Sequence, residues 1–474
     1  MRVFFSYILL LTLYLLPLKG FNSEKPNIVF IIADDIGWND LGCYGNTHVK
    51  TPNIDKLSAE GLQFNSAFLT ASSCSPSRCS IISGKYPHCD GAAELHTPLP
   101  EEEIPFPLLL KESGYYTVQA GKWHLGPAAH RAFDLYTDQN GYENGDGGEN
   151  MWIPFLKERP RDKPFFFWLA SHDAHRPWGA DTFKITHDPN KLDVPIFFED
   201  TPETRQDIAS YYNEIGRFDY YVGKVREELQ RQGVLENTVI IVTSDNGRPF
   251  PRCKTRVYDS GMKTPFIVYW PKEMRAKGLQ TESLISAVDI APTILEIAGV
   301  KIPEDFQGKS FLPVINNSTT EIRDEVFSEH NWHDYEALER MVRTKKYLYV
   351  LNARPNLTNG GPADSKTSAT QHSLNIVRDE GRLTPAQADI FMVPRPAEEL
   401  FDVEKDPLQL LNLASVPEYQ EVLRKMRKML NNWRTDTGDT TPEHLTPDWY
   451  DRETGAPLDI ERVRGTMPGS DNKK

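Results

Sequence analysis

The stretch 74–78 (CSPSR) contains residues that could take part in catalysis, because the thiol of Cys74 is followed by the guanidinium of Arg78. Two other short stretches, 34–35 (DD) and 245–246 (DN), offer oxygen ligands and contain neither histidine nor cysteine. Hard cations such as Ca²⁺ and Mg²⁺ prefer oxygen ligands, whereas nitrogen and sulfur ligands are typical of zinc. The residue types therefore indicate a site with two groups of oxygen ligands and nearby cationic groups.

Each of these stretches alone also has an ordinary explanation. The pentapeptide 74–78 is short enough to occur by chance as a loop thiol beside a turn, and Asn-Gly at 246–247 is a strong turn signal. A polar cluster after a strand is usually a solvated loop. The position of these stretches in the chain has to decide between the two interpretations.

Four apolar runs of strand length provide that context, because each of them stops at a polar cluster. The runs are 27–33 before the Asp pair, 115–120 before 121–124 (GKWH), 165–170 before 171–175 (SHDAH) and 238–243 before 244–247 (SDNG). Such uninterrupted runs are typical of buried parallel strands. Open α/β sheets bind ligands at the carboxyl ends of their strands, so the four clusters predict one shared crevice.

An amphipathic helix is predicted over 203–233, where apolar residues recur at near-helical spacing among charged ones. It directly precedes the fourth apolar run, which is where the crossover unit of a parallel sheet places its helix. We assign the aromatic residues of its stripe, including Tyr212 and Tyr220, to core packing. The pattern as a whole predicts an α/β fold.

The chain of 474 residues is long enough for a main domain and a smaller one. We predict a signal peptide over 1–22, a catalytic domain over 23–322 and a C-terminal subdomain over 323–474. The signal peptide is expected because a positive start is followed by apolar residues up to Leu18 and then by polar ones. A retained membrane anchor is the alternative. Export is therefore expected, to the periplasm or the outside of the cell, or to the lysosome in a eukaryote.

The formal net charge of −14 argues against nucleic acid as a partner, because phosphate backbones are bound by basic surfaces. A small anionic group can still bind in a local cationic pocket. Apart from the N-terminal stretch, no segment is apolar enough to cross a membrane, so no stable membrane span is expected.

The C-terminal part is predicted to contain a strand within 343–351 and a helix that includes Val422 and Trp433. Between them, 352–396 shows little hydrophobic periodicity. We interpret this segment as a long loop or insertion that either contacts substrate or is disordered. The last residues, 465–474, are expected to be frayed.

Taken in this order, the segments resemble the formylglycine-dependent sulfatases of the alkaline-phosphatase-like superfamily. The resemblance covers nearly the whole mature chain and rests on 34–35, 74–78, 114–124 (GYYTVQAGKWH), 245–247, 291–295 (APTIL) and 400–407 (LFDVEKDP). It implies a large mixed, mostly parallel sheet flanked by helices. It also implies a smaller C-terminal α+β domain with a short antiparallel sheet.

The resemblance further implies that Cys74 is oxidised to an aldehyde, formylglycine, by a formylglycine-generating or an anaerobic sulfatase-maturating enzyme. One hydroxyl of the hydrated aldehyde then attacks the sulfur of a sulfate ester, and the other hydroxyl later expels the sulfate. If Cys74 is converted, four other cysteines remain, and they could form disulfides or stay free: Cys43, Cys79, Cys89 and Cys253.

The family resemblance also implies the ligands of the cation, which is calcium in the family, with Mg²⁺ as the alternative. The expected metal ligands are Asp34, Asp35, the modified Cys74, Asp245 and Asn246. A bound cation would favour ionisation of the hydrate and polarise a sulfuryl oxygen.

The cationic residues of these motifs are expected to bind the anions of the site. Arg78 would hold the hydrate and the metal-site carboxylates, and Lys122 and Lys254 would place fixed positive charge on the sulfate. We predict His175 near the leaving oxygen and His124 on the hydrate, because histidine titrates near neutral pH, and the two roles could be exchanged.

Surface positions are expected for four further residues, with contact to the sugar as the alternative: His96, Trp178, His333 and Arg343.

Within the family, 171–177 (SHDAHRP) and 245–251 (DNGRPFP) look most like the heparan N-sulfatase (sulfamidase) branch, which also includes bacterial enzymes acting on ulvan. That branch is expected to carry an arginine where this chain has Lys254, and lysine fits an O-sulfatase equally well. The expected substrate is therefore a sulfated polysaccharide or its oligosaccharides, from algal glycans or glycosaminoglycans. An N-sulfated heparan-type glycan is the alternative.

Two rival functions belong to the same superfamily. A phosphoesterase would usually carry serine or threonine at position 74 and more histidine ligands for zinc. A glycan-binding relative without activity would have lost catalytic residues, whereas every expected one is present in this chain.

Overall fold

The computed structural model describes residues 25–137, 148–179, 185–274 and 276–470. The predicted signal peptide over 1–22 lies outside these residues. Within the described ranges, none of the helices combines the length and the apolar character needed to span a bilayer.

The described part of the larger domain is built on an eight-stranded sheet with the order β5-β4-β6-β1-β7-β8-β2-β9. Its centre consists of β1 (Asn27–Ala33), β4 (Tyr116–Gly121), β6 (Phe165–Ala170) and β7 (Thr238–Ser244), which coincide with the four predicted apolar runs. These strands pair in parallel, whereas β8 (Phe266–Tyr269) pairs with β7 in the antiparallel sense. The prediction of a mixed, mostly parallel sheet is confirmed.

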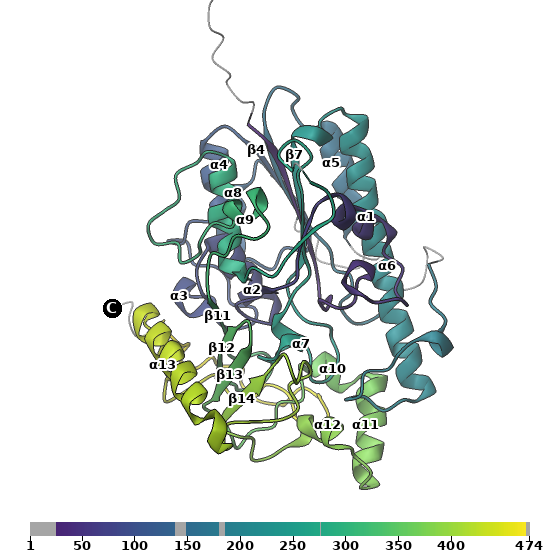
Figure 1. The fold of residues 1–474 in the computed structure, drawn as a ribbon, viewed down its shortest axis with the longest axis vertical. Helices are drawn as coiled ribbons and strands as arrows, with labels where there is room; N and C mark the ends of the chain where they lie inside the picture. The colour runs from purple at the N-terminus through teal and green to yellow at the C-terminus, as the bar shows by residue number, and fades with distance from the viewer. Residues whose placement is uncertain (1–24, 138–147, 180–184, 275, 471–474) are drawn as a thin grey trace, which may run out of the picture.

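Helices cover both faces of this sheet, as Figure 1 shows. On one face, Ile28, Phe30 and Ile32 of β1 share a core with α2 (Cys74–Ser83), α4 (Phe106–Glu112) and α8 (Ile290–Ile297). On the other face, the alternate residues of β1 share a core with α1 (Pro52–Glu60), α5 (Trp152–Glu158) and α6 (Pro202–Arg231). Because successive side chains of a strand point to opposite faces, burial on both sides explains why the runs are apolar without interruption.

The long helix α6 confirms the prediction over 203–233. The hydroxyl of Thr201 accepts a hydrogen bond from the backbone N–H of Thr204, and Pro202 occupies the first turn, so the start of the helix is capped in the usual way. Tyr212 is buried as expected. Tyr220 is 38 % exposed, so its assignment to the core is wrong.

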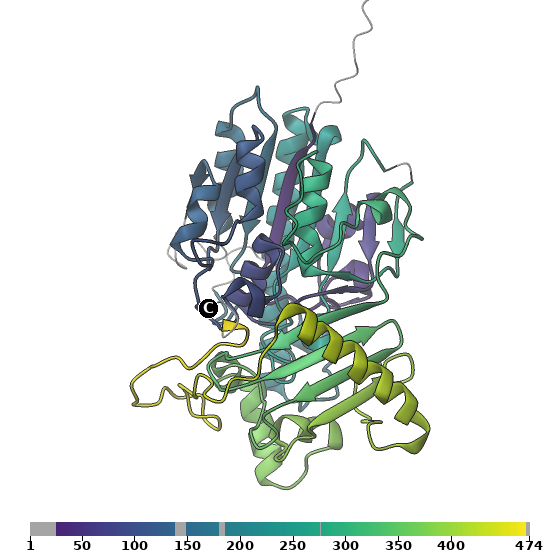
Figure 2. The same ribbon diagram turned by 90° about the vertical axis from the view of Figure 1, so that its left-hand side faces the viewer.

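A second, four-stranded antiparallel sheet forms the described C-terminal part, with β11 (Glu325–His330), β12 (Glu339–Thr344), β13 (Tyr347–Asn352) and β14 (Glu398–Asp402). The helix α13 (Gln420–Thr437) packs across this sheet, as Figure 2 shows, and Trp433 stacks on Phe327. The expected C-terminal α+β unit with a short antiparallel sheet is therefore present. The boundary between 322 and 323 stays a prediction.

The remaining described elements are short. They are β2 (Leu62–Phe64), β3 (Ala67–Phe68), β5 (Leu135–Tyr136), β9 (Leu279–Thr281), β10 (Ile285–Ser286), α3 (Pro87–Asp90), α7 (Asp259–Met262) and α9 (Leu312–Asn316).

The interpretation of 352–396 as a long loop is wrong, because this segment contains helices. They are α10 (Ala363–Lys366), α11 (Ala369–Asp379) and α12 (Pro385–Ala388). The buried face of α11 includes Thr370, Gln371 and Ser373, and the helix is amphipathic although only two of its buried residues are apolar. The helix is capped by Ser368 and packs against α6. Local signals and tertiary packing therefore both favour a helix in this segment.

The expectation of a frayed end is also wrong for 465–470. The backbone N–H of Gly465 donates to the hydroxyl of Thr446 at 2.9 Å, and that of Gly469 donates to the hydroxyl of Thr440 at 2.9 Å. Pro468 is buried. Residues 471–474 lie outside the described ranges.

Candidate active site

The carboxyl ends of β1, β4, β6 and β7 meet at one cavity of about 490 Å³. Residues that follow each of these strands line it, among them Asp34, Lys122, His175 and Lys254. Cys74, the first residue of α2, lies in the same lining. The shared crevice predicted from the four apolar runs is therefore present, since sequence-distant strand ends bring these groups together.

Three buried carboxylates form the core of the site. Asp34, Asp35 and Asp245 each offer an oxygen within 4.8 Å of the others, and all three are fully buried. Asn246 donates from its amide to Asp35 at 2.9 Å and to Asp245 at 2.7 Å. Carboxylates this close repel one another unless positive charge lies between or beside them.

The donor set fits a hard divalent cation. All predicted protein ligands apart from position 74 are carboxylate or amide oxygens, which Ca²⁺ and Mg²⁺ prefer. In addition, the side-chain oxygen of Asn246 is buried and has no hydrogen-bond partner among the described residues. A buried amide oxygen without a partner is costly, and exchange of the amide's oxygen and nitrogen positions would turn this oxygen toward the carboxylates and a cation held by them.

Three cationic side chains surround these carboxylates. The Nε of Arg78, which is fully buried, donates to Asp245 at 2.6 Å, and Arg78 Nη2 lies 3.8 Å from Asp34 Oδ1. Lys122 donates to the other oxygen of Asp34. Lys254 donates to Asp35 at 2.7 Å. Fixed positive charge therefore lies next to every carboxylate of the core.

The ionisation of the three carboxyls follows from this arrangement. Burial raises the pKa of Asp35 to about 7 and that of Asp245 to about 6, although Lys254 and Arg78 oppose the change. Burial also acts on Asp34, but Lys122, His175 and Arg78 outweigh it and hold the pKa of Asp34 well below its usual value. A bound cation would further favour the ionised form of all three groups.

Cys74 lies at the point where these groups converge. Its Sγ is 3.6 Å from Asp34 Oδ1 and 3.2 Å from the amide nitrogen of Asn246, and the residue is 2 % exposed. Burial raises the pKa of the thiol to about 12 despite the nearby Lys122 and Lys254, so the thiol is protonated at neutral pH. A protonated thiol is a weak nucleophile. The start of α2 adds partial positive charge, which suits a bound anion.

Two histidines project into the cavity beside this centre. The Nδ1 of His175 contacts the carbonyl oxygen of Arg176, which leaves Nε2 at 3.9 Å from Asp35 Oδ2. The Nε2 of His124 lies 2.7 Å from Nδ1 of His96. Burial and the adjacent Lys254 lower the pKa of His175, and burial with Lys122 lowers that of His124. Both rings are therefore neutral at pH 7.

Left-handed backbone conformations cluster at the cavity. Asp35 has φ of 62°, His124 has φ of 56° and Asp334 has φ of 65°. Residues other than glycine adopt this region at a cost, and such outliers concentrate at functional sites. The strain is consistent with a backbone shaped for the positions of the side chains.

Of the four further residues expected at the surface, two line the cavity and two do not. His96 and His333 are part of the lining, and His333 is buried, so its expected surface position is wrong. Trp178 is half-buried and donates to Asp207, whereas Arg343 is buried and pairs with Asp259. Arg343 was therefore also wrongly placed at the surface.

The sequence analysis missed one wall of the cavity. This wall comes from the C-terminal part and contains Asp334, Asp364, Thr367, Tyr450 and Gly455. Four of them lie in the segment interpreted as a loop or in the tail beyond α13, so no apolar run points to them. His172 also lines the cavity. It lies in the motif 171–177 but was not among the predicted site residues.

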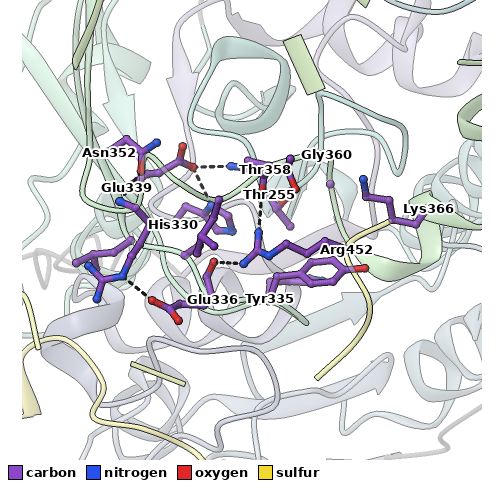
Figure 3. A pocket seen from close by; sticks show the side chains of 17 residues that line it. Thr255, His330, Tyr335, Glu336, Glu339, Asn352, Thr358, Gly360, Lys366 and Arg452 are labelled. Carbon is purple, nitrogen blue, oxygen red and sulfur yellow. Dashed lines mark hydrogen bonds and ion pairs between the residues drawn. The ribbon is translucent and has the colours of Figure 1, made fainter. Parts of the chain in front are cut away.

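A network of polar contacts joins segments next to this wall, and Figure 3 shows it around Arg452 and Glu339. Arg452 donates to the carbonyl oxygens of Thr358 and Glu336, and Asn359 donates to Glu339 at 2.8 Å. These contacts tie the tail beyond α13 to the segment that leads into α10. The wall is therefore anchored rather than loosely attached.

All five cysteines lie in the described ranges and are free thiols. The disulfides left open by the sequence analysis are thus not formed in the structure.

Comparison with known proteins identifies the family of this chain. A model of the sulfatase family matches residues 26–300, and a model of the N-sulphoglucosamine sulphohydrolase C-terminal region matches residues 253–353. An ulvan-active sulfatase of Formosa agariphila is 32 % identical over 461 residues, covering 88 % of this chain and 76 % of the relative. Human N-sulphoglucosamine sulphohydrolase is 31 % identical over 470 residues, covering 90 % of this chain and 93 % of the relative.

Solved structures show the same fold. A protein in complex with its substrate D-glucosamine-2-N,6-O-disulfate superposes with a TM-score of 0.68 at 19 % identity, covering 88 % of this chain and 98 % of that one. A 2-O glycosaminoglycan sulfatase superposes with a TM-score of 0.65 at 21 % identity, covering 88 % and 93 %. With the matched family model and the two relatives above 30 % identity, these findings show that the chain belongs to the sulfatase family and is a sulfuric ester hydrolase.

Proposed function

We propose that this protein is an exported sulfatase that hydrolyses sulfate esters on a sulfated polysaccharide or its oligosaccharides, with an oxidised Cys74 and a calcium ion at its centre. The observation that carries the proposal is the position of Cys74. Its Sγ lies within 3.6 Å of Asp34 and 3.2 Å of Asn246, inside a ring of carboxylates and lysines. An unmodified thiol has no evident use there, because its pKa is raised to about 12.

The oxidised side chain would supply a hydrated aldehyde, whose hydroxyl is a nucleophile that a thiol cannot replace. Asp34, Asp35, Asp245 and Asn246 would hold the cation that favours ionisation of this hydroxyl. Arg78 contacts Asp245 and lies near Asp34, so it would keep these carboxylates in place beside position 74.

The remaining residues have roles that follow from charge and position. Lys122 and Lys254 flank the cavity and would neutralise the sulfate oxygens as charge develops on them. His175 presents Nε2 to the cavity, and in its cationic form, with a proton on each ring nitrogen, it would protonate the leaving oxygen. His124 would move the proton of the hydroxyl at position 74, with His96 as its neighbour at 2.7 Å.

The class of substrate is inferred from the relatives. One is an ulvan-active sulfatase and another is N-sulphoglucosamine sulphohydrolase, so both O-sulfated and N-sulfated sugars have to be considered. Lys254 occupies the position where the sulfamidase branch is expected to carry arginine. Lysine fits an O-sulfatase equally well, so we propose an O-sulfated sugar, with N-sulfated heparan-type glycans as the second candidate.

Conversion of Cys74 would require a formylglycine-generating or an anaerobic sulfatase-maturating enzyme as a partner. Export to the periplasm, the outside of the cell or the lysosome fits the apolar N-terminal stretch and a polysaccharide substrate. Nucleic acid is not an expected partner, because the net charge is −14.

Mass spectrometry of the peptide that bears position 74, isolated from active protein, tests the central step. We expect the mass of an aldehyde or its hydrate in place of the thiol. A fully unmodified thiol in active protein would rule out the mechanism. Desulfation of ulvan and heparan oligosaccharides, measured by release of free sulfate with calcium and with a chelator, then separates the two substrate classes.

A further inference from the structure

The two walls of the cavity carry opposite kinds of charge. The wall from the larger domain contributes both lysines of the lining, Lys122 and Lys254, together with Asp34 and four histidines. The wall from the C-terminal part contributes Asp334 and Asp364, and the described lining from this part includes neither lysine nor arginine on the cavity. The sulfate has its cationic partners on one side only, so the opposite wall must receive another part of the sugar.

Asp364 is the carboxylate of this wall that comes closest to the reacting centre. Its Oδ2 lies 3.6 Å from Nε2 of His175 and 4.0 Å from Nζ of Lys254. Its Oδ1 is buried and has no hydrogen-bond partner among the described residues. Lys254 is much closer to Asp35, at 2.7 Å, than to Asp364, so it does not form a hydrogen bond with Asp364. Asp364 therefore retains capacity to accept hydrogen bonds beside the predicted position of the leaving oxygen.

The position of Asp364 is fixed by its surroundings. The backbone N–H of Ala363 donates to Asp334 at 2.9 Å, which ties the start of α10 to the loop after β11. Gly455 of the tail approaches α10 so closely that an added Cβ would lie 2.8 Å from Cβ of Lys366 and 3.0 Å from the carbonyl oxygen of Ala363. The polar network of Figure 3 anchors the segment that leads into α10. Asp364 cannot easily withdraw from the cavity.

We propose that Asp364 is a specificity residue. Its carboxylate accepts a hydrogen bond from a free hydroxyl or amino group next to the scissile sulfate. It rejects a sugar that carries a second anionic group at that neighbouring position. This inference rests on the proposed function, since it places the sulfate against Lys122 and Lys254. An ionised carboxylate is an acceptor only, so it can bind a hydroxyl but not a second sulfate. Repulsion between like charges is an effective way to exclude a wrong ligand.

Calorimetric binding to the calcium-loaded full-length protein tests this inference directly. The probes are monosulfated glucosamine and monosulfated galactose, each compared with the same sugar carrying a second sulfate on the neighbouring carbon. We expect the wild type to bind the monosulfated sugar of at least one pair about tenfold more tightly or better. We expect Asp364→Asn, which keeps the shape and removes the charge, to reduce this preference to about threefold or less.

A matched control is Asp459→Asn, which removes one charge from an exposed residue of the same tail that does not line the cavity. It should leave the preference unchanged. Equal binding of both members of every pair by the wild type would overturn the inference even if Asp364→Asn failed to fold. An unchanged preference in a folded Asp364→Asn would also overturn it, as would an equal loss of affinity for both members.

The binding measurements use protein with the unconverted thiol at position 74, which does not consume the probes. The proposed function is measured on separate samples, through hydrolysis of an aryl sulfate by protein whose position 74 has been converted. Lack of hydrolysis together with a clear binding preference would contradict the catalytic proposal alone. Hydrolysis without any binding preference would contradict the role of Asp364 alone.

Discussion

The two walls of the cavity are built in different ways. The wall from the larger domain consists of charged residues at the ends of central strands, and its core carboxylates and Arg78 are fully buried. The wall from the C-terminal part consists of residues from short helices, loops and a tail, with Asp364 partly exposed at 27 % of its side chain. The first arrangement suits chemistry that tolerates little movement, and the second suits the recognition of a variable sugar. Changes in the first wall should therefore affect the rate, and changes in the second should affect the choice of substrate.

The largest effect is expected from Cys74→Ala. It removes the proposed nucleophile, so turnover should fall by about four orders of magnitude or more. The fold should persist, because the helix α2 loses only one sulfur atom. Release of sulfate and the thermal midpoint are the measurements, and Cys43→Ala, which alters a half-buried thiol outside the cavity lining, is the control. Substantial turnover by Cys74→Ala would contradict the assignment.

Asp245→Ala should have the next largest effect, because it removes a proposed cation ligand and leaves Arg78 buried without its partner at 2.6 Å. Loss of one partner from a buried ion pair should lower the free energy of unfolding by about 3 kcal/mol. Calcium content, measured by mass spectrometry of the metal, should fall together with the rate. Asp245→Asn keeps the shape and is expected to be less damaging. Calcium content equal to that of the wild type in Asp245→Ala would show that the proposed ligand set is wrong.

Lys254→Ala tests the place where the two walls of the cavity meet, because Lys254 pairs with Asp35 and faces Asp364. Loss of one preorganised charge on the sulfate should lower kcat by about 100-fold. Lys254→Arg keeps the charge and should retain more activity, and its relative rates on O-sulfated and N-sulfated sugars bear on the substrate class. A rate for Lys254→Ala within about threefold of the wild type would remove Lys254 from the proposed mechanism.

The smallest effect is expected from Arg452→Ala, which detaches the C-terminal wall without touching the reacting centre. Its contacts with the carbonyl oxygens of Thr358 and Glu336 would be lost. KM should rise by about threefold to tenfold while kcat changes by less than about twofold. Arg382→Ala, an exposed arginine that contacts Glu380, is the control. A large fall in kcat with unchanged KM would contradict the division of labour between the walls.

The same division explains which features could be predicted from the sequence. The central strands and α6 carry strong local patterns, so their places and the residues that follow them, such as Asp34 and Lys122, could be predicted with the family resemblance. Asp364 and Tyr450 could not, because they reach the cavity only through packing between segments distant in the chain. The helix α11 is amphipathic and starts at a capping serine, so the interpretation of 352–396 as a loop overlooked a local signal that the sequence carries. Local periodicity reports burial of apolar side chains, and this wall is built mainly from polar contacts.

The burial of Cys74 has a consequence for the life of the protein before it becomes active. The side chain begins a helix whose ten residues are all buried, and it is packed with Leu95 and Trp332, the latter from the C-terminal part. Under the proposed function, the enzyme that oxidises this thiol would need wider access than the cavity of the folded chain gives, since Cys74 is only 2 % exposed there. Conversion should therefore take place on the nascent or still unfolded chain, before the final segments have been synthesised and docked. A folded protein that missed this opportunity would have to unfold before it could be activated.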